Sequence, residues 1–267
     1  MRNKYDIIAF ILIAVAIILP SLASLSLDGK ISHHADFFLH ASRHESVRIS
    51  ILEYHTFPLR AFWFGGGYPT LGDPEDPTLN PLTLITLFFG TVTGLKVIGI
   101  LSMLVAGLST YALAKYILGY TIWGALFSGL TFGLSVFLPL RIHNGNYNDI
   151  YSSFIPLCLF LIGLACRGRK AALLILPFLF YTMLSNGKTI ALMTIFYIGM
   201  LCILDIIPMF DTFGKSKPSY GRLDASKEFT EKQSAKNINI TPLKVFIIAL
   251  IITLLVGMVS WSGKIGQ

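Results

Sequence analysis

Long apolar runs, separated by short polar segments, recur along almost the whole chain and restrict what it can fold into. A helix needs about 20 mostly apolar residues to cross the hydrocarbon of a bilayer. In lipid every backbone polar group must be satisfied internally, which favours helices over irregular structure. We therefore expect an all-α fold, a polytopic transmembrane helix bundle with about seven spans near residues 7–25, 95–117, 121–140, 150–166, 171–186, 189–208 and 243–262.

Composition and charge agree with a membrane protein and exclude a nucleic-acid-binding one. Only 13% of the 267 residues are charged and 54% are hydrophobic, whereas soluble domains carry about 25% charged residues. The net charge of +7 could suggest a nucleic acid partner. Much of the excess, however, lies in segments between apolar runs, where basic residues set membrane orientation.

The basic residues also predict the topology. Lys115, a group at 167–170 and seven lysines and arginines at 215–244 lie on one side, while the facing short loops carry only Arg141 and Lys188. The positive-inside rule then puts the N-terminus in the cytoplasm of a multi-pass protein of the cell membrane. The expected organisation is a first anchor (1–25), an extracytoplasmic loop (26–94), a transmembrane bundle (95–208), a cytoplasmic loop (209–242) and a last span with its tail (243–267).

Two details of this organisation have alternatives. Small residues at 21–24 would also suit a cleaved signal peptide, but the length of the first run favours an uncleaved anchor. Residues 82–90 are too short for a span of their own, and we expect them to form a short interfacial or re-entrant helix at the end of the extracytoplasmic loop.

The first half of the extracytoplasmic loop carries a candidate binding stripe. On a helix over 36–52, Asp36, His40 and Arg43 share one face because they lie at i, i+4 and i+7. A carboxylate, an imidazole and a guanidinium on one stripe suit a polar, anionic ligand. A solvated helix with local charge pairs explains the same spacing.

The second half of that loop is rich in glycine, proline and acid. Gly65–Gly67 disfavours a helix, and four prolines then stiffen the chain. Asp73 and Glu75 lie between those prolines, where a rigid acidic turn could hold a divalent cation or sugar hydroxyls. A plain turn is the alternative.

A second outward segment, RIHNGNYND at 141–149, carries more polar groups than a turn requires. Asn-Gly alone would supply the turn, yet Arg141, His143 and Asp149 accompany it. Asp149 also begins the predicted fourth span, where a carboxylate is costly unless it is paired or ligated. A functional use of this segment and a purely structural one remain open.

The order of several short motifs resembles the GT-C superfamily of polytopic glycosyltransferases. It is most similar to the YfhO-like and 6-pyruvoyl-tetrahydropterin synthase-related membrane families. The resemblance covers about residues 5–205 and rests on DFFLHASR at 36–43, FPLR at 57–60, GGYP at 66–69, Asp73-Pro74, NPL at 80–82, AGLSTYAL at 106–113, Gly145-Asn146 and Pro156-Leu157.

The resemblance implies a GT-C-like bundle whose helical first outward loop packs on the spans. It further implies transfer of a sugar from a polyprenyl-phosphate carrier to a glycan or protein acceptor at the outer membrane face. Asp36 matches the catalytic carboxylate of such enzymes, and Asp149 is the nearest counterpart of a second acidic residue. The expected substrate-binding residues are His40, Arg43, Arg60, Tyr68, Arg141 and His143.

The resemblance also bears on the cofactor and on whether the chain is part of a longer protein. A divalent cation, Mg²⁺ or Mn²⁺, held by Asp73, Glu75 or Asp149 is an optional cofactor. The chain has no Asp-x-Asp pair, but Asp73 and Glu75 have the same spacing in Asp-Pro-Glu. GT-C enzymes usually have more spans and a soluble C-terminal domain, so we expect the chain to be an N-terminal portion.

The rival functions are a non-catalytic subunit for lipid-glycan transport or assembly, and a metal site built from His33, His34, Asp36, His40 and His44.

Overall fold

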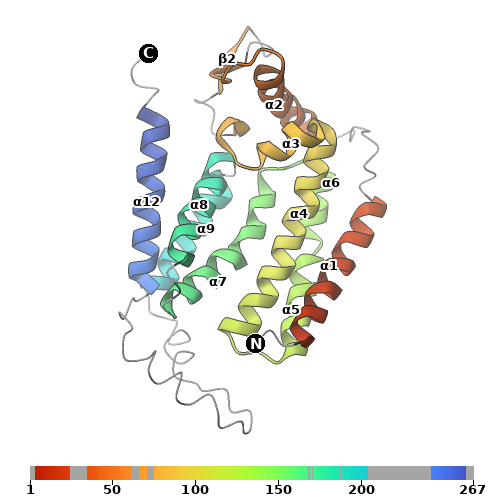
Figure 1. Cartoon of the computed structure of the whole chain (residues 1–267), viewed down its shortest axis with the longest axis vertical. Coiled ribbons are helices and arrows are strands. Elements are labelled where there is room, and N and C mark those ends of the chain that lie inside the picture. Colours follow the sequence, from red (N-terminus) through yellow and green to blue (C-terminus); the bar gives the residue numbers. More distant parts are fainter. Residues whose placement is uncertain are drawn as a thin grey trace.

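The protein is a bundle of long helices with a small cap at one end (Figure 1). The computed structural model describes residues 4–24, 35–61, 66–70, 75–167, 169, 171–186, 188–203 and 242–262. Within these ranges nearly all regular structure is helical, apart from one two-stranded antiparallel ribbon. The all-α class predicted from the apolar runs is therefore confirmed.

Four helical segments of the described chain are long and apolar enough to cross a membrane. The first is α1 (Lys4–Ser24), and the second is α4 (Thr91–Ala112) with its π-helical continuation η3 (Leu113–Ile117). The third combines α5 (Ile122–Gly133) with α6 (Phe137–His143), and the fourth combines η4 (Asp149–Phe154) with α7 (Ile155–Cys166). These apolar helices fit an association with membranes.

The described residues after Cys166 form three further helices of the bundle, α8 (Ala171–Asn186), α9 (Lys188–Ile203) and α12 (Pro242–Ser262). Within them, Leu174–Asn186 and Lys244–Leu254 are shorter apolar helical stretches. They lie within the runs at 171–186 and 243–262, which were expected to form the fifth and seventh spans. The total of about seven spans stays a prediction.

The third segment able to cross a membrane consists of two helices and not of one continuous helix. Residues 121–140 were expected to form one helix, but α5 ends at Gly133 and α6 begins at Phe137. Pro139 explains the break, because its ring would clash with the carbonyl of Ser135, four residues earlier, in a continuous helix. Helix α6 also continues past residue 140, the expected end of the span, to His143. Arg141 and His143 therefore lie in the last turn of α6, and the prediction that they belong to a loop is wrong.

Small residues allow α1, α4 and α5 to pack closely. A Cβ added to Gly129 would lie 2.8 Å from the carbonyl oxygen of Gly107, and one added to Gly133 would lie 2.9 Å from the Gly107 Cα. Ile17 of α1 fills the same crossing, since its Cδ1 would lie 2.7 Å from a Cβ on Gly107. Close packing of small residues is a main source of helix association in membranes.

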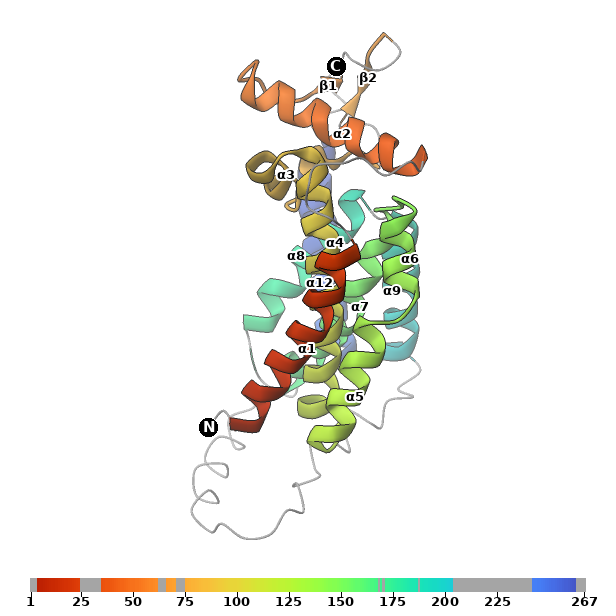
Figure 2. The same ribbon diagram turned by 90° about the vertical axis from the view of Figure 1, so that its right-hand side faces the viewer.

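One end of the bundle carries a cap, which we define as the described residues within 35–89. Its elements are α2 (Ala35–Leu52), β1 (Arg60–Ala61), β2 (Tyr68–Pro69), η2 (Pro77–Leu79) and α3 (Thr83–Phe89). Figure 2 shows α2 lying across the bundle end, with α3 between α2 and the spans. The helices expected over 36–52 and within 82–90 are confirmed.

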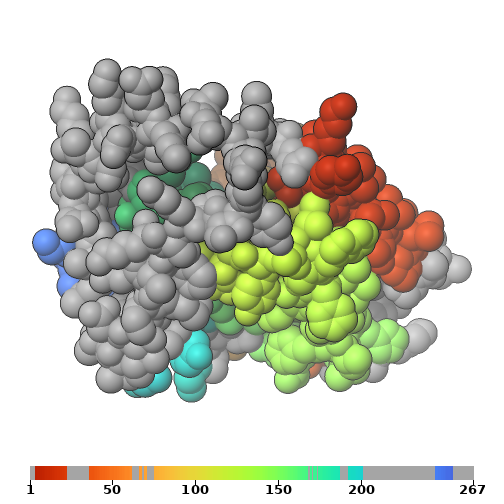
Figure 3. All heavy atoms as spheres, turned by 90° about the horizontal axis from the view of Figure 1, so that it is seen from below, coloured from red at the N-terminus to blue at the C-terminus, as the bar shows by residue number. Residues whose placement is uncertain are grey.

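The bundle end away from the cap holds the start of α1 and the end of α4, which lie side by side there with α5 (Figure 3). Arg167, after α7, donates hydrogen bonds to the carbonyls of Tyr116 and Ile117. These carbonyls belong to the last turn of a helix and lack intrahelical partners. The basic residues Lys115 and Arg167 therefore lie away from the cap.

Candidate functional site

Two histidines on the inner face of α2 are buried beneath the cap. His40 and His44 are each only 3% exposed, one helical turn apart. Burial, assisted by the nearby Arg43 guanidinium, lowers the pKa of His40 from 6.5 to about 4. Burial, with His40 as a secondary cause, lowers the pKa of His44 to about 3. Both imidazoles are therefore neutral at pH 7.

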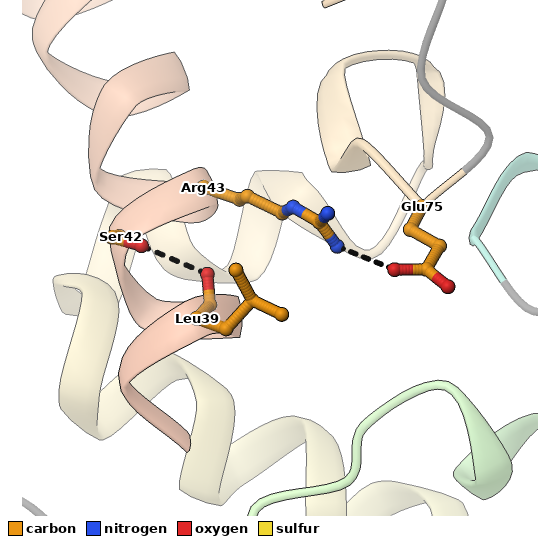
Figure 4. A network of polar contacts seen from close by, with 4 residues as sticks. All are labelled: Leu39, Ser42, Arg43 and Glu75. Carbon is orange, nitrogen blue, oxygen red and sulfur yellow. Dashed lines mark hydrogen bonds and ion pairs between the residues drawn. The ribbon is translucent and has the colours of Figure 1, made fainter. Parts of the chain in front are cut away.

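The Arg43 side chain pairs with Glu75 across the cap (Figure 4). Its Nη1 donates to Glu75 Oε2 at 2.8 Å, and the Arg43 side chain is only 13% exposed against 45% for Glu75. The pair connects α2 to the turn before η2. Arg43 is thus held by a partner 32 residues away in the sequence, which neither the ligand-binding stripe nor local charge pairing on a solvated helix predicted.

The segment between α6 and η4 packs onto the first turns of α2. Gly145 has a positive φ of 79°, and a Cβ there would lie 2.6 Å from the Phe37 Cα. Only glycine permits both this conformation and this approach. Two residues later, the Tyr147 ring makes edge-on contacts with Phe37 and His40, with centroids 6.1 Å and 6.0 Å apart. The start of α2 and the segment at 141–149, more than a hundred residues apart in the sequence, are therefore in direct contact.

Asp149 follows this segment and forms an ion pair with Arg141. The Arg141 Nε lies 3.0 Å from Asp149 Oδ2, and the two side chains are 40% and 22% exposed. Arg141 also lies over the Phe137 ring, 5.3 Å from its centroid. The sequence indicated that a carboxylate at the start of an apolar helix would need to be paired or ligated, and Arg141 is the residue that pairs with it.

We define the candidate site as Asp36, His40, Arg43, Arg141, Tyr147 and Asp149. Asp36 is exposed in the first turn of α2, beside the Phe37 backbone that Gly145 contacts. The structure thus brings the segment that carries Arg141 and Asp149 against the start of α2. The predicted approach of the Asp36 and Asp149 carboxylates to one another stays a prediction.

The other predicted site residues are placed less centrally. Arg60 is exposed on β1 and its Nη2 donates to the Gly67 carbonyl at 3.5 Å, while the Tyr68 backbone pairs with Ala61 in the ribbon. His143 is exposed at the end of α6. Asp73, the partner proposed for Glu75 in a metal site, lies outside the described residues, as do His33 and His34.

Within the ranges that the structure describes, no three His, Cys, Asp or Glu side chains come together in a group that could hold a metal ion. Glu75, the described member of the expected acidic turn, faces Arg43. An open hollow of about 440 Å³ is lined by Ile51, His55, Thr56 and Phe57. It lies at the opposite end of α2 from Asp36, roughly 22 Å away along the helix axis between Asp36 and Ile51, so it is separate from the candidate site.

A buried polar network between the cap and the bundle escaped sequence reasoning. Asn80 Nδ2 donates to Tyr151 Oη at 2.6 Å and to the Thr182 carbonyl at 3.1 Å, and the Asn186 side chain also hydrogen-bonds to Tyr151. Asn186 Oδ1 is buried without a hydrogen-bond partner. In the sequence, Asn80 was noted only as the first residue of the NPL motif, and nothing there indicated its role in a buried network.

Comparison with family models, with curated proteins and with solved structures finds no match to this chain.

Proposed function

We propose that the protein is a multi-pass membrane glycosyltransferase of the GT-C type. It would move a sugar from a polyprenyl-phosphate carrier to a cell-envelope glycan or protein at the outer membrane face. The observation that carries the proposal is the packing of the Arg141–Asp149 segment onto the first turn of α2. A sugar-transfer site needs a base and phosphate-neutralising cations close to one substrate, and this packing gathers carboxylates and guanidinium groups at one end of the bundle.

The proposed orientation places the cap outside the cell and the N-terminus in the cytoplasm. Lys115 and Arg167 lie at the bundle end away from the cap, and basic residues near span ends favour the cytoplasmic side. In this orientation the candidate site faces the compartment in which polyprenyl-phosphate sugars donate to envelope acceptors.

In the proposed reaction Asp36 takes the proton of the acceptor hydroxyl. The acceptor oxygen bonds to the anomeric carbon, the bond from that carbon to the phosphate oxygen breaks, and its electron pair stays on the lipid phosphate. Arg141 is the cation best placed to neutralise the departing phosphate, since it is 40% exposed and a guanidinium suits phosphate geometry. Arg43 and Arg60 are further candidates, while Asp149 would orient Arg141. A divalent ion remains optional.

The test uses the full chain in proteoliposomes with radiolabelled polyprenyl-phosphate hexoses and an envelope extract as acceptor. Asp36→Asn keeps the size of the side chain and removes the base, so transfer should fall by about 10²–10⁴-fold. Glu53→Gln, another exposed carboxylate of the cap, should leave transfer unchanged. Full activity in Asp36→Asn would remove Asp36 from the mechanism.

The same assay separates the rival function. A non-catalytic subunit for lipid-glycan transport or assembly would retain the labelled carrier without transferring its sugar, and it would do so equally well in Asp36→Asn. If the unmodified chain neither retains a labelled carrier nor transfers its sugar, both functions are rejected.

A further inference from the structure

Helix α3 has its polar residues inside and its apolar residues outside. Its sequence is TLITLFF, with no charged residue. Thr83 and Thr86 are 4% and 0% exposed, whereas Leu84, Phe88 and Phe89 are 57%, 84% and 60% exposed. A short helix on a water-facing surface would show the reverse pattern, so water is the wrong surrounding for this face.

Specific contacts fix which way α3 faces. Thr86 Oγ1 lies 3.3 Å from His44 Nδ1 of α2, and Thr83 Oγ1 donates to the Pro77 carbonyl at 2.5 Å. A Cβ on Gly94 would lie 2.7 Å from the Thr86 Cα, so α4 approaches the same side of α3 at backbone distance. With the threonine side held by α2 and α4, the outward direction of Leu84 and Phe88 is determined.

The position of α3 indicates what covers the exposed face. Only Gly90, with a φ of 78°, separates α3 from α4, which is one of the segments able to cross a membrane. Figures 1 and 2 show α3 directly at the cap end of α4. The spans expose apolar side chains such as Leu101 and Phe127, at 41% and 72%. The exposed side chains of α3 are likewise apolar, and the helix carries no charge.

We propose that Leu84, Phe88 and Phe89 form a lipid-docking face that inserts into the hydrocarbon of the leaflet on the cap side. The occupant is the acyl chains of bulk lipid, because the face is uncharged and lies directly at the end of α4, a helix able to cross a membrane. Insertion holds α3 below the headgroups and sets the height of α2, so the charged residues of the cap lie at headgroup level. This inference depends on the membrane assignment and not on sugar transfer.

The test places a nitroxide spin label on α3 and measures how often it collides with a reagent dissolved in lipid and with one dissolved in water. The full chain, with its three cysteines replaced by alanine, carries Phe88→Cys or Leu84→Cys and is reconstituted in phosphatidylcholine–phosphatidylglycerol vesicles. The matched control is Glu53→Cys, an exposed charged position just after α2. At both α3 positions, collisions with oxygen relative to a water-soluble nickel chelate should be severalfold more frequent than at Glu53.

Two results would overturn the proposal. One is a Phe88 label that the nickel chelate reaches as easily as the Glu53 label, which would place the face in water. The other is spin–spin broadening at Phe88 that disappears on dilution with unlabelled protein, which would make a second copy of the chain the occupant. Because no activity is measured, failure of the sugar-transfer proposal leaves this result unaffected.

Discussion

At the scale of single residues, the buried histidines of α2 are the most unusual feature of the cap. His40 is surrounded by Arg43, Glu75, Asp36 and the ring of Tyr147, and His44 faces His40 and Thr86. An imidazole that is buried and neutral resists protonation, since its charge would be poorly solvated. The docking of α2 should therefore depend on pH.

Acidification is expected to loosen α2. With a folded pKa of about 4 for His40 and about 3 for His44 against 6.5 for an ordinary histidine, the unfolded state binds more protons below pH 6.5. The cap should thus be fully stable above pH 6.5 and lose up to roughly 1.4 kcal/mol per pH unit per histidine as pH falls toward 4. Hydrogen exchange of the α2 amides between pH 7 and 4, corrected for intrinsic rates, measures the loss.

Two variants control that experiment. His44→Gln removes one titrating group and should flatten the pH dependence, although it costs stability at all pH values. His55→Gln changes an exposed histidine of the cap and should leave the profile as it is. Equal pH dependence in the unmodified chain and in His44→Gln would refute a role for this histidine.

The Tyr151 hydroxyl should contribute measurably to stability. Tyr151→Phe takes away the hydroxyl that the Asn186 side chain hydrogen-bonds to, whereas Asn80 Nδ2 keeps its hydrogen bond to the Thr182 carbonyl. A buried polar group left without a partner costs about 1–3 kcal/mol. Tyr147→Phe keeps the ring contacts with His40 and Phe37 and should cost less. Reversible unfolding in mixed detergent micelles gives both free energies of unfolding; a larger loss in Tyr147→Phe would contradict the network.

At the scale of elements, glycine determines how closely α4 and α5 cross. Gly129→Ala places a Cβ 2.8 Å from the Gly107 carbonyl oxygen, a backbone atom that cannot move alone. The expected cost is about 1–3 kcal/mol of unfolding free energy, the usual range for overpacking. In Gly124→Ala, on the same helix, the nearest atom is the Thr121 side chain at 3.4 Å, so stability should be unchanged or slightly higher. Equal effects of the two substitutions would contradict the close crossing.

The apolar runs predicted most elements well, because a continuous hydrophobic stretch in this length range has few alternatives to a helix. The exceptions have local causes. Pro139 interrupts α5–α6, and Gly90 separates α3 from α4, which begins at Thr91 and not near 95. Both signals were present in the sequence, but a hydropathy pattern does not register one proline or one glycine.

The candidate site was only partly predictable for a different reason. The segment at 141–149 and the stripe on α2 were each recognised from their unusual polar groups. Their contact through Gly145 and Tyr147 depends on how the spans pack, which no local pattern encodes. The pairing of Arg43 with Glu75 across 32 residues was not anticipated for the same reason.

At the scale of the whole molecule, the account depends on which side of the membrane the cap faces. The four segments able to cross a membrane fit a membrane-associated bundle, and the site proposed for lipid-linked sugars requires the cap to be outside. The charges at the far end of the bundle, Lys115 and Arg167, are the basis for that orientation.

Labelling of single cysteines in intact cells tests this orientation most directly. Phe57 in the cap and Tyr120 between η3 and α5 are 57% and 51% exposed, and each is replaced by cysteine in a chain whose native cysteines are alanine. A membrane-impermeant maleimide should label Phe57→Cys in intact cells and label Tyr120→Cys only after the cells are broken. Labelling of Tyr120→Cys alone in intact cells, or of both positions to the same extent, would contradict an outward-facing cap and the sugar-transfer site placed on it.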